Sequence, residues 1–122
     1  MIKFKDASVE AEYYALPFQN KRMRELLQAL DIFVTLELGK ELMITEIYRN
    51  WHDNTAQGGI PTSPHMTWEG VDLRSWIYTD AEIQRIVGFL NQFRFRNGKQ
   101  VCVYHAVKNG APHLHIQYGK AA

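Results

Sequence analysis

Residues 63–74 join a proline-containing loop to a short segment that alternates like a strand. In residues 70–74, Gly-Val-Asp-Leu-Arg, Val71 and Leu73 fall on one face of a strand and Asp72 falls on the other. His65 stands in the loop, seven residues before Asp72. A strand can hold the Asp72 carboxylate rigidly while the loop brings His65 to it. Neutral imidazole and carboxylate are ligand types that suit zinc, so the segment predicts half of a zinc site.

A second pair of histidines stands near the C-terminus, in Pro-His-Leu-His-Ile at residues 112–116. On a strand, His113 and His115 share one face, while Leu114 and Ile116 face the core. A catalytic zinc takes three protein ligands and keeps its fourth position open. We therefore expect this pair to supply the ligand that His65 and Asp72 leave missing.

The spacing around Asn109-Gly110 predicts a hairpin between strands near 101–107 and 113–118. With these two residues as the turn, Tyr104 lies opposite His115 and His105 lies opposite Leu114. His105 then points to the other face and is excluded as a ligand. A one-residue slip of the register would reverse this assignment.

The remaining pattern predicts two helices, one further strand and a long loop. Apolar residues at helical spacing favour a core-packing helix from residue 20 to about Gly39. A strand is expected over 42–48 and a loop over 50–64. Thr79 to Glu82 has the form of a capping box, and a second amphipathic helix follows it. Helices and strands of this kind indicate an α+β domain.

With 122 residues the chain is long enough for one domain, 1–122, and too short for two. The 46% hydrophobic and 22% charged residues are typical of a globular protein. A net charge of +1 offers no electrostatic reason to expect nucleic acid or a membrane surface as partner. The single Cys102 excludes an internal disulfide and is expected to be a small buried apolar residue. No secretory signal or membrane span is predicted, so we expect a protein made in the cytoplasm whose export would need help from another protein.

The pattern Ser63-x-His65-x4-Gly70-x-Asp72, followed by His-x-His near the C-terminus, resembles the zinc D-alanyl-D-alanine peptidases of bacterial cell walls. These enzymes share their fold with the Hedgehog signalling domain. The resemblance runs from about residue 21 to 118 and includes an upstream strand that ends in Tyr48-Arg49. It implies a small, mainly antiparallel sheet with helices packed on one side. It also implies that His65, Asp72 and His115 bind Zn²⁺ and that Arg49 holds the substrate carbonyl or carboxylate.

The chain departs from the family pattern at three positions. Trp68 stands where the family has glycine, and Gly70 stands where it has alanine, so the turn between the ligands must be built differently. Pro112 stands where many members carry a catalytic glutamate. The His-x-His branch of the family instead suggests His113 as the general base, with Glu69 as the runner-up.

The resemblance implies zinc-assisted hydrolysis of amide bonds in peptidoglycan stem peptides or cross-links, as a D,D-carboxypeptidase or endopeptidase. His113 would move the proton from water to the leaving amine, and Arg49 would stabilise the developing charge. One alternative is a non-catalytic, zinc-containing binding or signalling domain of the same fold, which the missing glutamate favours. The other is a metal-free structural or interaction protein.

Overall fold

The computed structural model describes residues 1–18, 21–56, 63–93, 100–105 and 111–118. Within them, the chain is an α+β domain with one five-stranded sheet in the order β1-β2-β3-β5-β4. β1 is parallel to β2, and all other pairs are antiparallel. The predicted α+β class and the mainly antiparallel sheet are therefore confirmed. The strands are β1 (Ile2–Phe4), β2 (Leu42–Glu46), β3 (Gly70–Arg74), β4 (Cys102–His105) and β5 (His113–Gln117).

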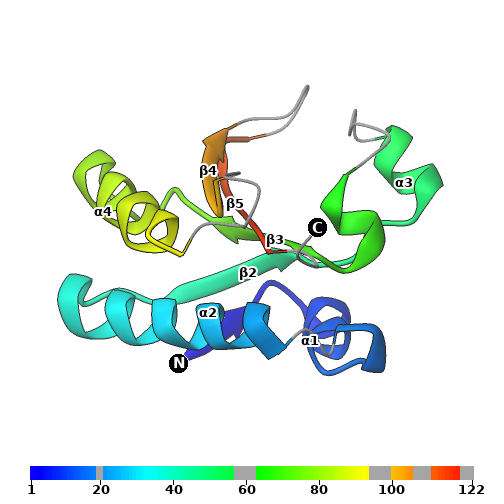
Figure 1. The fold of residues 1–122 in the computed structure, drawn as a ribbon, viewed down its shortest axis with the longest axis horizontal. Helices are drawn as coiled ribbons and strands as arrows, with labels where there is room; N and C mark the ends of the chain where they lie inside the picture. Colours follow the sequence, from blue (N-terminus) through cyan, green and yellow to red (C-terminus); the bar gives the residue numbers. More distant parts are fainter. Residues whose placement is uncertain (19–20, 57–62, 94–99, 106–110, 119–122) are drawn as a thin grey trace.

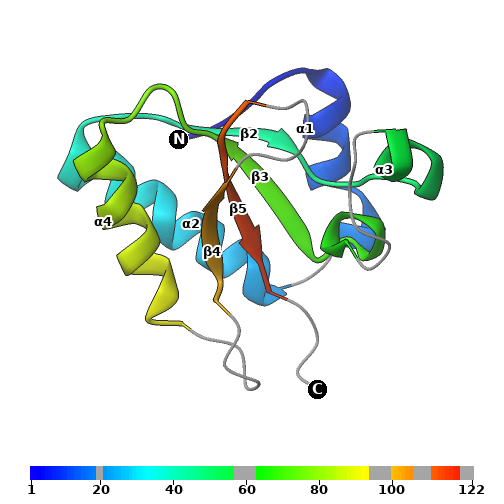
Figure 2. The same cartoon turned by 90° about the horizontal axis from the view of Figure 1, so that it is seen from above.

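Two of the helices, α2 and α4, lie against the same face of the sheet and contact each other (Figures 1 and 2). At the other side of the sheet, α3 and η3 lie close to the end of β2 (Figure 1). One face is thus covered by helices, and the other is left for the polar side chains described below. The helices are α1 (Ala7–Tyr13), α2 (Lys21–Phe33), α3 (Trp51–Ala56) and α4 (Asp80–Asn91), with shorter turns η1 (Leu16–Phe18), η2 (Val34–Leu38) and η3 (Pro64–Thr67).

Helix α2 packs on the sheet through the apolar positions that the sequence pattern predicts. Met23, Leu27 and Leu30 are fully buried. Each such side chain stabilises the fold by about 1.5–3 kcal/mol relative to leaving it exposed. The helical segment ends at Gly39, whose φ of 63° is left-handed, a backbone conformation that glycine adopts without steric cost.

Helix α4 begins with the predicted capping box. The Thr79 hydroxyl accepts a hydrogen bond from the Glu82 N–H (3.2 Å), and the Glu82 carboxylate accepts one from the Thr79 N–H (2.8 Å). Both bonds satisfy N–H groups that lack partners inside the helix. Ile83, Ile86 and Leu90 then follow at helical spacing and are buried.

The alternation predicted for residues 70–74 is confirmed in β3. Val71 and Leu73 are fully buried in the core, as are Leu114 and Ile116 on the neighbouring β5. Asp72 therefore faces the opposite side of the sheet. Cys102 is also fully buried, and burial raises the pKa of its thiol to about 12, which makes it a small core residue as predicted.

The loop prediction for residues 50–64 is wrong over its first part, because Trp51–Ala56 forms α3. The Asn50 side chain accepts a hydrogen bond from the Asp53 N–H (2.7 Å), as an N-cap residue does. Six residues are too few for helical periodicity to show, so the Asn- and Asp-rich composition suggested a loop. Residues 57–62 lie outside the described part. The preceding strand, β2, ends at Glu46 rather than at Tyr48.

The predicted register of the hairpin is also wrong by one residue. In the structure, Tyr104 pairs with Leu114 and His105 pairs with His113. An odd number of residues, 106–112, lies between His105 and His113. A two-residue turn with continuous pairing on both sides needs an even number, so the predicted turn does not fit this register. The turn predicted at Asn109-Gly110 lies outside the described residues. As a result, His105 shares the face of His113 and His115, and Tyr104 lies on the opposite face.

No helix in the described part of the chain is both long enough and apolar enough to cross a bilayer.

Candidate metal centre

His65, Asp72 and His115 come together on the sheet face opposite α2 and α4. Asp72 and His115 are directly paired across β3 and β5, and His65 reaches them from η3. Asp72 Oδ1 is 3.0 Å from His65 Nε2 and 2.9 Å from His115 Nδ1. All three residues are buried, with at most 8% of their surface exposed. The potential ligand atoms of the three residues lie within 4.8 Å of one another, a grouping that could hold a metal ion.

His65 lies in the short helix η3 and is held through hydrogen bonds of both its backbone N–H and its backbone carbonyl. At the start of η3, the Ser63 hydroxyl accepts a hydrogen bond from the His65 N–H (3.3 Å). The His65 carbonyl in turn accepts one from the Arg49 N–H (3.1 Å), which ties η3 to the chain just after β2. Ser63 therefore acts as a helix cap beside the site.

The turn between the two ligands is built around Trp68 and Gly70. Trp68 adopts a left-handed backbone with φ of 62°, which is rare for a residue with a side chain. Its ring stacks on Tyr48 at 4.4 Å between centroids, and this contact holds the turn against the end of β2. A Cβ at Gly70 would lie 3.2 Å from His115 Cε1 and 3.0 Å from Pro64 Cβ. The large side chain of Trp68 is thus accommodated. Position 70, in contrast, requires glycine, because a side chain there would interfere with the close approach of His65 and His115.

The hydrogen bonds of His65 determine which ring nitrogen can coordinate a cation. Its Nδ1 is 2.9 Å from the Ile47 carbonyl, which can only accept, so Nδ1 carries a proton. In a neutral ring, Nε2 then presents a lone pair to Asp72 Oδ1, which also carries lone pairs. Two such atoms 3.0 Å apart require a proton or a cation between them.

Without a metal, a proton between His65 and Asp72 meets this requirement. Burial disfavours a charged ring, but the hydrogen bond and charge of Asp72 outweigh burial and raise the pKa of His65. Burial likewise opposes ionisation of Asp72, yet hydrogen bonds from His115 and His65 outweigh it and lower the pKa of that carboxyl well below its ordinary range.

The donor set also fits zinc. Two imidazole nitrogens and a carboxylate oxygen form the kind of three-ligand set used at catalytic zinc sites. Ligands about 2.0–2.1 Å from a tetrahedral ion lie roughly 3.3 Å from one another, close to the Asp72–histidine distances found here. The Ile47 carbonyl holds the His65 ring in the orientation and tautomer that expose Nε2, as outer partners of metal-bound histidines do.

A pocket of about 260 Å³ opens beside the three ligands, and Asp72 forms part of its lining. His113 also lines it, with Nε2 3.5 Å from Asp72 Oδ2. His113 lies on the same strand face as His115, as the sequence pattern predicts. It is half-buried, so it is positioned by the protein yet accessible to a molecule in the pocket.

Arg49 lies at the same pocket but is held by neighbours that were not predicted. Its Nε and Nη2 donate to the two oxygens of Glu46 at 2.7 and 2.9 Å, and Nη1 donates to Asn54 at 3.0 Å. Nη2 is also 3.9 Å from Asp72 Oδ2. These bonds use three of the five N–H groups of the guanidinium, so at most one on each terminal nitrogen remains for a ligand. Glu46 stands three residues before Arg49, but outside a helix this spacing does not predict a contact, so no sequence signal indicated the pair.

His105 is the other functional candidate that the sequence interpretation missed. Its ring centroid is 4.9 Å from that of His113 and 5.6 Å from that of His115. Partial burial, together with the neighbouring His113 and His115, lowers the pKa of His105. A correct register would have placed it here. His52, in contrast, lies on the exposed α3.

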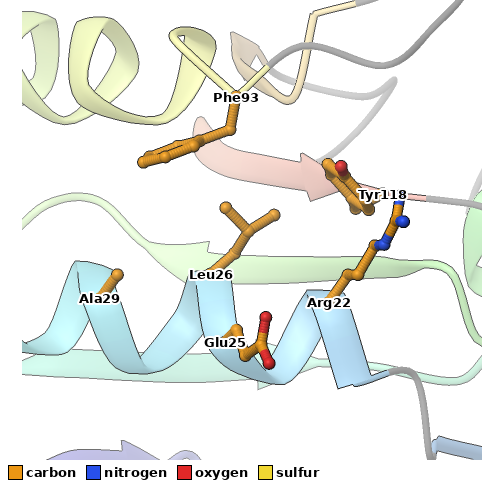
Figure 3. A pocket seen from close by; sticks show the side chains of 6 residues that line it. All are labelled: Arg22, Glu25, Leu26, Ala29, Phe93 and Tyr118. Atoms are coloured by element: carbon orange, nitrogen blue, oxygen red, sulfur yellow. The ribbon is translucent and has the colours of Figure 1, made fainter.

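A second pocket, of about 350 Å³, lies between α2, Phe93 after α4 and Tyr118 after β5 (Figure 3). Leu26 and Ala29 form its floor along α2, and Arg22 and Tyr118 lie together at one end (Figure 3). It has no histidine or cysteine in its lining and shares no residue with the metal centre. The pocket beside Asp72 is therefore the better candidate for chemistry.

No family model, curated protein or solved structure matches this chain.

Proposed function

We propose that this protein is a zinc-dependent peptidase that hydrolyses amide bonds in peptidoglycan stem peptides or cross-links. The observation that carries the proposal is the convergence of His65, Asp72 and His115, from separate elements, beside a pocket. The pocket also presents His113 and Arg49, the two further groups that amide hydrolysis at such a centre needs. The peptidoglycan substrate rests on the resemblance of the motifs to D-alanyl-D-alanine peptidases.

His65 Nε2, Asp72 and His115 Nδ1 would hold the ion. When bound, zinc supplies a water of lowered pKa and a Lewis acid that polarises the scissile carbonyl. His113 Nε2 accepts a proton from the attacking water and delivers it to the nitrogen of the leaving amine as the C–N bond breaks. A free N–H of Arg49 faces the negative charge that develops on the carbonyl oxygen. Glu46 and Asn54 keep the guanidinium in place during this step.

One observation favours the non-catalytic alternative, a zinc-containing binding or signalling domain. Pro112 occupies the position at which many of the peptidases that the motifs resemble carry a glutamate, and a proline cannot transfer a proton. In the peptidase, His113 would transfer the proton instead, from the neighbouring position and the same strand face as His115. The two functions therefore differ in whether His113 transfers a proton.

Variants of the two strand histidines separate a ligand from a proton carrier. Protein purified without a histidine tag should contain about one zinc per chain, and His115→Ala should lose it. His113→Ala should retain zinc but hydrolyse purified peptidoglycan about 10²–10⁴ times more slowly. Metal content is measured by elemental analysis and hydrolysis by the release of amino groups.

His52→Ala is the matched control, because this histidine is exposed on α3, and it should change neither quantity. Zinc retention in His115→Ala would contradict the ligand assignment. Full zinc content with no hydrolysis of any cell-wall peptide would favour the binding domain instead.

A further inference from the structure

Two cationic side chains, Lys5 and Arg74, line the pocket that contains Asp72 and His113. Lys5 follows β1, and its N–H donates to the Ile44 carbonyl (2.9 Å), which holds it beside β2. Arg74 ends β3, two residues after Asp72, and pairs with His113 across the sheet. Strand alternation places Arg74 on the same face as Asp72. Both cations therefore lie within reach of a molecule bound at the metal centre.

Within the part of the chain that the structure describes, the other charged groups of the pocket have ion-pair partners, but Lys5 and Arg74 have none. Glu46 uses both carboxylate oxygens for Arg49, and Asp72 is shared among the histidines. Among the described residues, neither Lys5 nor Arg74 has a carboxylate within ion-pair distance. The lining thus carries a positive charge that no carboxylate of the described residues neutralises.

Arg74 is also held in place by an aromatic ring. Its guanidinium carbon lies 5.2 Å from the ring centre of Trp76, which lines the same pocket and is 76% exposed. Stacking of this kind restrains the long side chain while leaving its N–H groups for other partners. The exposed Trp76 beside Arg74 provides both an apolar surface and a charged group to a ligand.

We propose that Lys5 and Arg74 bind a substrate carboxylate next to the scissile bond. The inference rests on the proposed peptidase function and narrows it to anionic peptides. The Cα atoms of Asp72 and Arg74 are about 6.6 Å apart along the strand. Consecutive Cα atoms of a bound peptide are about 3.8 Å apart. A carboxylate one or two residues from the cut is therefore within reach of the Arg74 side chain. Arg49 is less suited to this task, because Glu46 already occupies its bidentate edge.

The carboxylate can be the free C-terminus of the substrate or an acidic side chain, and matched peptides distinguish the two. The probes are N-acetylated tripeptides that end in two D-alanines, as the free acid and as the C-terminal amide. A third probe is the amide in which D-glutamate replaces the last residue. Both kcat/KM and the Kd from isothermal titration calorimetry are measured for each peptide, the latter with and without zinc.

The wild-type protein should prefer a peptide with a carboxylate over the neutral amide. Lys5→Gln and Arg74→Gln should each reduce that preference about five- to tenfold, through KM and Kd rather than kcat. Because the groups are near solvent, raising the ionic strength from about 0.05 M to about 0.5 M should also weaken it. Preference for the free acid identifies an exopeptidase, and preference for the D-glutamate amide identifies recognition of an acidic side chain.

Arg85→Gln serves as the matched control, since it removes one exposed cation from α4, outside this pocket. It should leave the preference unchanged. Two results would overturn the inference while leaving the peptidase proposal standing. One is that the wild type has the same kcat/KM and the same Kd for acid and amide. The other is that the preference for the carboxylate survives in the double variant Lys5→Gln, Arg74→Gln. Charge-dependent binding without any hydrolysis would support carboxylate binding by Lys5 and Arg74 and would contradict the peptidase proposal.

Discussion

The Asp72 carboxylate lies among four basic side chains, and its two oxygens face different groups. Oδ1 is within 3.0 Å of His65 and His115, the candidate metal ligands. Oδ2 is 3.5 Å from His113 and 3.9 Å from Arg49, which both line the pocket. One carboxylate therefore connects the groups that would hold the ion with those that would act on the substrate.

At this scale we predict that Arg49 contributes to the reaction rather than to metal binding. Arg49→Ala should lower kcat by about 10², the usual cost of losing one donor to a developing oxyanion, with little change in zinc content. Arg49→Lys should restore only part of the activity, because an ammonium cannot span both oxygens of Glu46. Steady-state kinetics and elemental analysis measure the two effects.

Loss of Arg49 also leaves the Glu46 carboxylate without its partner, which should cost about 1–3 kcal/mol of unfolding free energy. Glu46→Gln tests this separately, because it weakens the same ion pair while keeping the guanidinium. If Arg49→Ala had unaltered kinetics on every cell-wall substrate, Arg49 would have no role in the reaction.

At the scale of elements, the close approach of η3 to β3 and β5 brings the metal ligands together. Gly70, the first residue of β3, leaves no room for a Cβ, which would lie 3.0 Å from Pro64 Cβ and 3.2 Å from the His65 nitrogen of η3. A Cβ added at Gly70 would also lie 3.2 Å from Cε1 of His115 on β5. Because three elements meet at a position without a side chain, a small change there should affect both histidine ligands.

We predict that Gly70→Ala separates these elements. The added Cβ would lie 3.0 Å from Pro64 Cβ and 3.2 Å from both the His65 nitrogen and His115 Cε1. Such overpacking typically costs about 1–3 kcal/mol, and it should weaken zinc affinity because both ligands must shift. Denaturant unfolding and a zinc titration measure the two losses.

Gly88→Ala in α4 is the matched control. A Cβ at Gly88 would contact nothing within 4 Å, so this change should stabilise the helix by about 0.5–1 kcal/mol and leave zinc affinity unaltered. Undiminished zinc affinity in Gly70→Ala would show that the ligands do not depend on this close contact.

At the scale of the whole molecule, folding and the candidate site are linked through protons. His65 has a raised pKa, so its contribution to stability is present below about pH 6.5 and is lost as pH rises through that raised pKa. Asp72 has a lowered pKa, so its contribution is present above about pH 3.9 and is lost as pH falls through the lowered value. In the metal-free protein, His65 and Asp72 should therefore contribute most to the free energy of unfolding at mildly acidic pH.

Zinc should reverse this trend between about pH 5 and pH 8, because only deprotonated histidines coordinate the ion. Stabilisation by a ligand reaches about 2.7 kcal/mol at a free concentration of 100 times Kd, so the gain should grow as pH rises. Thermal unfolding of metal-free and zinc-loaded protein across this range measures both curves. A zinc-induced shift in Tm that did not increase with pH would contradict coordination by these histidines.

Much of the fold could be predicted because its signals are local. Buried positions recur at helical spacing in α2, the capping box starts α4, and β3 alternates between core and site. Alternation also predicted the strand faces of Asp72, His113 and His115, and the resemblance to the peptidases selected His65, Asp72 and His115 as the candidate ligands. For the elements and their faces, a few neighbouring residues determine the outcome through backbone geometry and hydrophobic burial.

Tertiary structure decided the features that depend on distant parts of the chain. The β4–β5 register depends on pairing between strands, and a shift of one residue placed His105 on the site face. The engagement of Arg49 by Glu46 depends on how the chain turns after β2, which no periodicity encodes. The pocket of Lys5 and Arg74 forms only because β1 and β3 both lie beside β2. The sequence alone thus determined which residues could bind a metal, whereas long-range packing decided which charged groups surround it.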